Sequence, residues 1–398
     1  MTTHTSHAKF AAFSFVFLLL LSCTKHKDKS TTDDFKPVPI TGPTVVAATG
    51  DTVFAIDVAT GTYRWMYPAD WGIAASVKGE GLTYIAAYDT LRALDDSTGN
   101  IVWKFGASNE ITNSVGLSGG SVYIADNNGQ VYSLDAKTGN MNWNSLGGTL
   151  WATFYVSGNL ALGSSNDGNL YAFNATTGKL LWKDATGQTG IPATMNLING
   201  LVYTTTFNYK LQALDAATGG LTWSFDLGDS LIDTPAMAGG LVYTGKGDKR
   251  LYALDAATGV PAWTYSKGDS VFFYLPVVSG GIVYTCAADQ ELYAFDALTG
   301  KLNWTFAANE GLQTRPVVAN GIVYLCSINT VFALDAATGA IKWSYHAAVV
   351  NMMPPVIVNG NLYFGGKDQK LYSLNAQTGS LNWSYFLNGY VNLPPFVF

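Results

Sequence analysis

Histidine, cysteine and charged residues are all scarce in this chain. Its 398 residues include four histidines and three cysteines, and charged residues make up 13%. His4, His7 and His26 lie near the N-terminus, which leaves only His346 in the expected folded domain. A metal site of several histidines is therefore excluded. A Ser–His–Asp triad would depend on His346 alone, and no Gly-x-Ser-x-Gly elbow is present. The sequence thus offers no catalytic residue.

The chain also lacks any concentration of positive charge. Its formal net charge is −6 at pH 7, and lysine and arginine form no run. Charge-driven binding to nucleic acid or anionic lipid needs such a patch, so we expect no nucleic-acid partner. "DNNGQ" at 126–130 and "NDGN" at 166–169 faintly resemble calcium-loop fragments, but they lack the other ligands and the bidentate glutamate. Both have the composition of hairpin turns, so we expect no metal site.

No apolar run is long enough to span a bilayer. The run at 10–21 is short and follows a single cation, Lys9, which is typical of an export signal. It stops at Leu-Leu-Ser-Cys, residues 20–23, which resembles the bacterial lipobox and implies that Cys23 carries lipid. The alternative is an ordinary secretory signal with an incidental cysteine. We predict a signal peptide (1–22), a lipidated cysteine with a flexible tether (23–43) and a folded domain (44–398).

One phrase recurs along the folded domain. It reads Ala/Ser-x-Asp/Asn-x-x-Thr-Gly-x-x-x-Trp, as in "ALDAATGAIKW" at 333–343, and its tryptophan returns every 38–41 residues. Each period holds four short runs of alternating apolar residues between Gly, Asn and Asp turns, without a helical period. Four strands per roughly 40 residues is the pattern of one β-propeller blade, so we predict an all-β, single-propeller fold. The nine tryptophans are Trp65, Trp103, Trp143, Trp182, Trp223, Trp263, Trp304, Trp343 and Trp383.

The two ends of the domain decide the expected number of blades. Residues 44–67 match the second, third and fourth strands of a blade, and residues 390–398 match an innermost strand. Pairing of these ends would complete the first blade and remove two open sheet edges. The arithmetic then gives nine blades. Eight is the alternative, because propellers typically have four to eight.

The recurrent phrase is expected at the turn between the third and fourth strands. Its aspartate can accept backbone N–H groups, its glycine allows an otherwise closed backbone conformation, and its tryptophan offers a broad packing surface. The phrase resembles the tryptophan-docking motif of quinoprotein-type, or pyrroloquinoline-quinone-like, propeller repeats. The resemblance implies that each indole packs on a motif glycine and joins adjacent blades. We therefore interpret the nine tryptophans as structural. Asn174 and Asn375 replace aspartate in two copies, which a turn-forming role tolerates.

The same resemblance raises the question of an enzyme. Quinoprotein dehydrogenases of this architecture carry adjacent cysteines joined by a disulfide, and a calcium-holding set of carboxylates and amides. No two cysteines are adjacent here. Cys286 and Cys326 occupy equivalent places in neighbouring repeats and are interpreted as small buried hydrophobes. We expect no cofactor and no catalysis, and we keep a quinone-dependent dehydrogenase as an alternative.

The segments that follow each motif tryptophan vary most between repeats. They are expected to lead to the next innermost strand and to open on one face near the central funnel. Aromatic residues beside charges suit a contact surface, although the same residues could simply fill and solvate the funnel. The candidate contact residues are Trp71, Glu110, Trp151, Asp229, Asp269, Phe273, Arg315 and Asn351.

Size, lipobox and repeat type together resemble the BamB family of outer-membrane β-barrel assembly lipoproteins. The resemblance implies an exported, non-catalytic scaffold, lipid-anchored to the bacterial envelope, most simply at the outer membrane. Its partners would be envelope proteins, barrel-assembly components among them, held on a monomeric ring. The alternative is a periplasmic or surface propeller that binds a small ligand or glycan, because architecture alone is weak evidence for function.

Overall fold

The computed structural model describes most of the chain from residue 42 onward. Residues 37–398 form one compact unit, and its regular structure, where described, is entirely β. In these residues no helix is long and apolar enough to cross a membrane. The described residues are 42–147, 150–165, 167–185, 195–206, 208–228, 235–246, 248–268, 276–308, 311–312, 314–347, 353–391 and 393–397.

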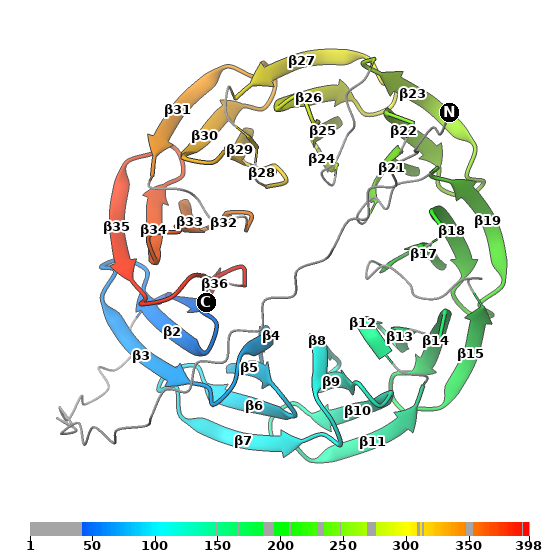
Figure 1. Ribbon diagram of the computed structural model, residues 1–398, viewed down its shortest axis with the longest axis vertical. Coiled ribbons are helices and arrows are strands. Elements are labelled where there is room, and N and C mark those ends of the chain that lie inside the picture. The colour runs from blue at the N-terminus through cyan, green and yellow to red at the C-terminus, as the bar shows by residue number, and fades with distance from the viewer. Residues whose placement is uncertain are drawn as a thin grey trace, which may run out of the picture. The chain divides into compact units, whose positions relative to one another are not determined.

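Four-stranded antiparallel sheets stand as blades around a central axis (Figure 1). The described strands form nine such sheets, so the predicted nine-bladed propeller is confirmed and the eight-bladed alternative is wrong. The innermost strand of each blade lines the centre, and the outermost strand forms the rim (Figure 1). We number the blades in chain order and give their strands from the inside outward.

Blade 1 consists of β36 (Phe396–Val397), β1 (Thr44–Ala48), β2 (Thr52–Asp57) and β3 (Tyr63–Pro68); blade 2 of β4 (Ile73–Gly79), β5 (Leu82–Ala87), β6 (Thr90–Asp95) and β7 (Ile101–Gly106); blade 3 of β8 (Ile111–Ser118), β9 (Ser121–Asp126), β10 (Gln130–Asp135) and β11 (Met141–Leu146). Blade 4 consists of β12 (Leu150–Ser157), β13 (Leu160–Ser165), β14 (Asn169–Asn174) and β15 (Leu180–Ala185); blade 5 of β16 (Met195–Ile198), β17 (Leu201–Thr205), β18 (Lys210–Asp215) and β19 (Leu221–Asp226); blade 6 of β20 (Ala236–Ala238), β21 (Leu241–Lys246), β22 (Arg250–Asp255) and β23 (Pro261–Ser266). Blade 7 consists of β24 (Val277–Ser279), β25 (Ile282–Cys286), β26 (Glu291–Asp296) and β27 (Leu302–Ala307); blade 8 of β28 (Val317–Ala319), β29 (Ile322–Cys326), β30 (Thr330–Asp335) and β31 (Ile341–His346); blade 9 of β32 (Val356–Val358), β33 (Asn361–Gly365), β34 (Lys370–Asn375) and β35 (Leu381–Phe386).

The last strand of the chain completes the first blade. β36 pairs antiparallel with β1, with Val397 opposite Val45 and Phe396 opposite Val46. In Figure 1 the red end of the chain accordingly lies beside the blue strands. The predicted closure by the two ends of the domain is confirmed. The pairing covers the edge that β1 would otherwise leave open in blade 1.

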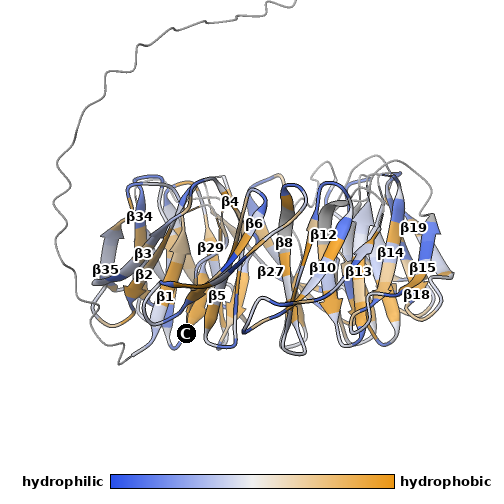
Figure 2. Cartoon of the chain, turned by 90° about the horizontal axis from the view of Figure 1, so that it is seen from below, coloured by the Kyte–Doolittle hydropathy of each residue, from blue (hydrophilic) through white to orange (hydrophobic). Residues whose placement is uncertain are grey.

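The hydrophobic core lies between blades. Strands in the middle of a blade are buried along their length, as β5 is, while outer strands such as β7 alternate exposed and buried residues. One buried cluster joins Tyr84 and Leu91 of blade 2 to Val122 of blade 3. Figure 2 shows the strands upright, with the hydrophobic residues mainly on the strands and many hydrophilic ones in the turns. Each blade therefore depends on its neighbours to cover both of its faces.

Because the strands are antiparallel, their turns alternate between two faces of the ring. We call the face with the turns between third and fourth strands the motif face. The face with the turns between second and third strands, and with the connections between blades, is the connection face. The described chain enters at the motif face, where the Pro43 carbonyl accepts the Val58 N–H at 3.1 Å. Arg64 Nη1 also donates to the Gly42 carbonyl at 2.7 Å.

Candidate functional site

The motif turns form a compact structural unit on the motif face. In blade 5, Asp215 Oδ1 accepts the backbone N–H groups of Ala217 at 3.2 Å and Thr218 at 2.8 Å, and the Thr218 hydroxyl at 2.7 Å. These bonds, led by the Thr218 hydroxyl, lower the pKa of Asp215. A carboxylate that is already held by three donors fixes the turn and is poorly placed to act as a base.

Each motif tryptophan reaches into the following blade. The Trp223 indole N–H donates to the Ala256 carbonyl of blade 6 at 2.9 Å. A Cβ on Gly259, whose φ is +72°, would lie 2.6 Å from Trp223 Cδ2, so only glycine fits beneath the indole. At the closure, Trp383 makes the same two contacts, with the Val58 carbonyl and with Gly61. The remaining acceptor carbonyls, in chain order, belong to Asp96, Ala136, Ala175, Ala216, Ala297, Ala336 and Ala376.

In six of the blades, as far as they are described, a buried tyrosine shares this acceptor. The Tyr203 hydroxyl donates to the Ala256 carbonyl at 3.0 Å, beside the Trp223 N–H. Tyr363 in blade 9 is also fully buried, but its hydroxyl has no hydrogen-bond partner among the described residues. The six tyrosines are Tyr84, Tyr123, Tyr203, Tyr243, Tyr284 and Tyr324.

A second set of aspartates lies in turns of the connection face. Asp167 and Asp368 each accept a tyrosine hydroxyl at 2.6 Å. Asp126, in the first calcium-like fragment, accepts from Tyr132 at 3.0 Å, from the Ser108 hydroxyl and from backbone N–H groups. Their oxygens are thus engaged within the protein. In the described part of the chain, no group of three or more His, Cys, Asp or Glu side chains is placed to hold a metal ion.

The connection face carries an exposed aromatic pair at blades 1 and 2. Trp71, in the β3–β4 connection, is 62% exposed, and Tyr88, in the β5–β6 turn, is 47% exposed. Their ring centroids lie 5.4 Å apart with planes tilted by 30°. Tyr88 has φ +53°, an uncommon conformation for a bulky residue. Trp71 was a predicted contact residue, whereas Tyr88 was missed; a tyrosine in a tight turn that favours Gly or Asn was the available signal.

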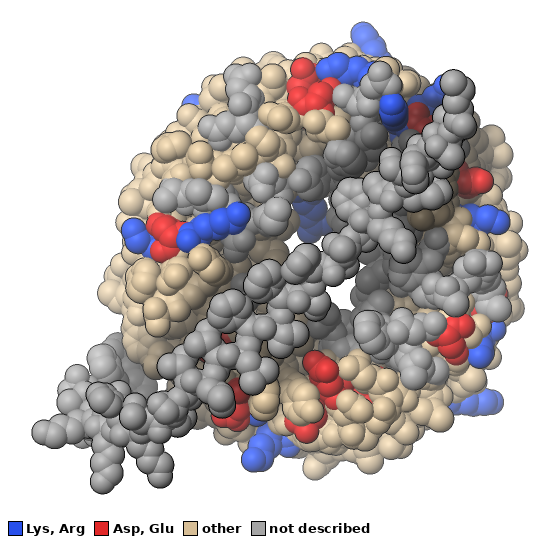
Figure 3. Space-filling model, in the orientation of Figure 1, with Lys and Arg blue, Asp and Glu red and all other residues tan. Residues whose placement is uncertain are grey.

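Carboxylates occur in the same turns and connections as this pair. Asp70 is exposed and lies 3.4 Å from the largely buried guanidinium of Arg92. The predicted contact residue Glu110 is exposed, and its Oε2 accepts from the Asn127 amide at 3.3 Å. We refer to the set Asp51, Asp70, Trp71, Tyr88, Asp89 and Glu110 as the acidic–aromatic patch. On the face shown in Figure 3, lysine and arginine are scattered among acidic residues, and the described residues form no continuous basic area.

Of the other predicted contact residues, only Arg315 has a described side chain, and it lies in a different connection from the patch. Arg315 is exposed in the connection between blades 7 and 8. Trp151 lies near the start of β12, and its side chain is outside the description. Asp229, Asp269, Phe273 and Asn351 lie outside the described residues.

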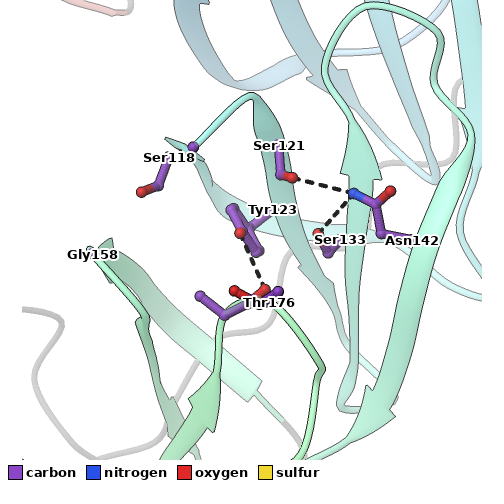
Figure 4. A pocket seen from close by; sticks show the side chains of 9 residues that line it. Ser118, Ser121, Tyr123, Ser133, Asn142, Gly158 and Thr176 are labelled. Carbon is purple, nitrogen blue, oxygen red and sulfur yellow. Dashed lines mark hydrogen bonds between the residues drawn. The ribbon is translucent and has the colours of Figure 1, made fainter.

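Small cavities open between blades on the motif face. One of about 330 Å³ lies between blades 3 and 4 (Figure 4). The Asn142 amide donates to the Ser121 hydroxyl at 3.2 Å and to the Ser133 hydroxyl at 3.3 Å. Tyr123 and Thr176 also line it (Figure 4), and none of its lining residues is charged. Such a lining can hold a small, neutral, polar molecule.

The two cysteines of the ring are poor nucleophiles. Cys286 and Cys326 are free and fully buried, so the expectation of two buried hydrophobes in place of a disulfide is confirmed. Burial raises the pKa of the Cys326 thiol to about 12 and also raises that of Cys286. Because the thiolate is the reactive form, neither thiol is activated.

A family model described as "Outer membrane protein assembly factor BamB" matches three stretches of the chain, residues 49–166, 166–273 and 267–390. The chain belongs to the BamB family. Comparison with curated proteins finds no match to the sequence. The motif turns and tryptophan contacts described above occur in all three matched stretches.

Solved structures share the fold at low sequence identity. The crystal structure of BamB from Moraxella catarrhalis is 20% identical with a TM-score of 0.56, covering 77% of this chain and 94% of that one. The computationally designed Ika8 protein is 18% identical with a TM-score of 0.59, covering 79% and 96%. A europium-containing methanol dehydrogenase is 14% identical with a TM-score of 0.53, covering 75% and 81%. At such identities these likenesses show the propeller fold alone.

Proposed function

We propose that this BamB-family chain is a non-catalytic scaffold of the bacterial cell envelope that holds partner proteins, in outer-membrane protein assembly or a related envelope complex. The observation that carries the proposal is the exposed Trp71–Tyr88 pair on the connection face of the ring. Exposed aromatic residues beside charges are typical of protein contact surfaces. Family membership supports envelope proteins as the class of partner.

The ring is well suited to present such a surface rigidly. Each blade junction is held by an indole on a glycine and by an indole N–H bond to a carbonyl, as at Trp223 and Gly259. These contacts occupy the motif face. The β3–β4 connection that carries Trp71 lies on the opposite face and contributes no residue to the clamp contacts described above, which leaves Trp71 exposed to a partner.

We further propose that lipid on Cys23 anchors the protein, after removal of residues 1–22, through a tether at 23–43. The Leu-Leu-Ser-Cys sequence supports this. Arg64 Nη1 donates to the Gly42 carbonyl at the motif face, which is the face opposite the acidic–aromatic patch. Mass spectrometry of the mature N-terminal peptide should find lipid on Cys23, and Cys23→Ala should release a folded ring from membranes. A native N-terminus at another residue would contradict the anchor.

The absence of catalysis is part of the proposal. No two cysteines are adjacent, and the thiols within the ring are buried. Purified protein with pyrroloquinoline quinone and calcium should therefore reduce no dye with alcohols or sugars above the rate without protein. Quinone-dependent turnover would overturn this part and favour the dehydrogenase alternative.

The uncharged cavity between blades 3 and 4 favours a second candidate, a propeller that binds a small polar ligand or glycan. Calorimetric titration with neutral sugars would test it. Saturable binding that Asn142→Leu abolishes would support it, because Asn142 holds the hydroxyls of the cavity wall.

Affinity capture tests the scaffold. Lipidated protein should be isolated from cross-linked envelopes as wild type, as Trp71→Ala and as Leu298→Ala, with co-purified proteins identified by mass spectrometry. Leu298 is a matched control, because it is 69% exposed but lies in a motif turn on the opposite face. We expect barrel-assembly or other envelope subunits with wild type and Leu298→Ala, and their loss with Trp71→Ala. Equal recovery with all three proteins would contradict docking at the connection face.

A further inference from the structure

The aromatic pair is built to stay exposed. Trp71 and Tyr88 come from different blades, and their rings meet at 5.4 Å without being covered. Tyr88 holds a backbone φ of +53°, a conformation that costs a bulky residue about 1 kcal/mol or more. Tyr209, Lys249, Gln290 and Gln369 also have positive φ in the corresponding turns of other blades, so the turn itself accounts for this conformation. The exposure of two adjacent aromatic rings, 62% and 47%, is what points to a role in binding.

Backbone hydrogen bonds fix the segments that carry the pair. On the Trp71 side, the Ala69 N–H donates to the Asp51 carbonyl at 2.6 Å. On the Tyr88 side, the Ile111 N–H donates to the Tyr88 carbonyl at 2.7 Å. The patch is therefore pre-organised across blades 1, 2 and 3, which lowers the entropic cost of binding.

The charges around the pair are mostly negative. Four carboxylates, those of Asp51, Asp70, Asp89 and Glu110, belong to the patch. One nearby cation is Arg92, whose side chain is only 10% exposed and bonds to Asp70. Another is Lys104, which lies opposite Arg92 on the neighbouring strand β7. A purely apolar partner would strip water from the carboxylates without pairing them, which is unfavourable.

We infer that the acidic–aromatic patch binds an arginine-bearing basic segment of the partner protein, an inference that rests on the proposed docking role of the connection face. A guanidinium can stack on the Trp71 and Tyr88 rings while its N–H groups pair with Asp70 or Asp89. Arginine fits better than lysine, because its planar group stacks and donates in two directions at once. The buried Arg92 leaves most of the carboxylate Asp70 exposed for this contact.

The test uses the purified full ring and a short fluorescein-labelled peptide of alternating glycine and arginine, followed by fluorescence anisotropy at low salt. The control peptide replaces arginine with citrulline, which has the same shape but no charge. We expect the citrulline peptide to bind at least about ten-fold more weakly, since it loses both the cation–π and the ion-pair contacts. Trp71→Ala should weaken the arginine peptide about five-fold. Asp70→Asn with Asp89→Asn should also weaken it, and Leu298→Ala should not.

Equal binding of both peptides, or binding unaffected by Trp71→Ala and by the two Asp→Asn changes, would overturn the inference. Binding of neutral oligosaccharides that depends on Trp71, without binding of the arginine peptide, would overturn it in favour of a glycan site. Envelope capture separates this failure from failure of the scaffold. If the partner is lost with Trp71→Ala but retained with the Asp→Asn pair, docking stands and its basic chemistry does not. If Trp71→Ala retains the partner, the docking role itself fails.

Discussion

Replacing Trp223 by alanine tests whether the indoles hold adjacent blades together. Trp223 is 7% exposed, contacts Gly259 of the next blade, and lies 5.9 Å from the Tyr203 ring. Truncation of a large buried aromatic leaves a cavity and costs about 3–5 kcal/mol. The lost N–H bond adds at most about 1 kcal/mol within that range, because the Ala256 carbonyl still accepts the Tyr203 hydroxyl at 3.0 Å.

The assay is guanidinium unfolding followed by far-ultraviolet circular dichroism. Trp71→Ala is the control, since a 62% exposed side chain outside the motif should cost less than about 1 kcal/mol. Gly259→Ala disturbs the same contact from the other blade, because the new Cβ would lie 2.6 Å from Trp223 Cδ2. Combined with Trp223→Ala it should cost less than the sum, as the missing indole makes room for the methyl group. An unchanged unfolding midpoint for Trp223→Ala, or strict additivity of the pair, would refute the reasoning.

Deleting residues 391–398 should expose the edge of β1 and cause aggregation or a large loss of stability in thermal unfolding, and a soluble ring with unchanged melting would show that closure is dispensable. Tyr324→Phe should cost about 1 kcal/mol through its lost bond to the Ala376 carbonyl, whereas Tyr363→Phe should cost almost nothing, and equal losses would contradict this assignment. Burial raises the pKa of Asp184, so the folded state binds this proton more tightly and loses stability as pH rises from the ordinary to the raised pKa. Asp184→Asn should therefore be more stable than wild type near neutral pH, with the difference vanishing below about pH 4 in melts across pH, and a variant less stable at pH 7 would reverse the sign.

The ring could be predicted from the sequence because its repeat is strong and its ends are informative. The spacing of the tryptophans sets one blade per period, and residues 390–398 had no place except the innermost strand of blade 1. Tyrosine partners such as Tyr203 were not anticipated. Their spacing from the motif varies little, but the acceptor lies in the following blade, more than fifty residues away for Tyr203 and Ala256.

The candidate site was predicted only in part. Trp71 and Glu110 stood out as an aromatic and a charged residue in variable segments, and both lie in the acidic–aromatic patch. Tyr88 could not be associated with Trp71, because which connection faces which turn depends on how blades 1 and 2 pack. Asp184 illustrates the same limit. It occupies the repeat position of Phe225, whose ring meets that of Tyr252 in the following blade edge-on at 5.1 Å. Residues at this position face the neighbouring blade, so the burial of Asp184 could not be judged from its own strand.

The division of the ring into two faces explains where function can change without loss of the fold. On the motif face, a change at Gly259 or Trp223 disturbs two blades at once, because their contact spans the junction, and a change at Asp215 disturbs the turn that its own hydrogen bonds fix. The connections need only lead from an outer strand to the next inner strand. Substitutions at connection residues such as Trp71 should therefore leave the clamps between blades intact. Under the proposed docking role, partner specificity could then change on the connection face while the motif face maintains stability.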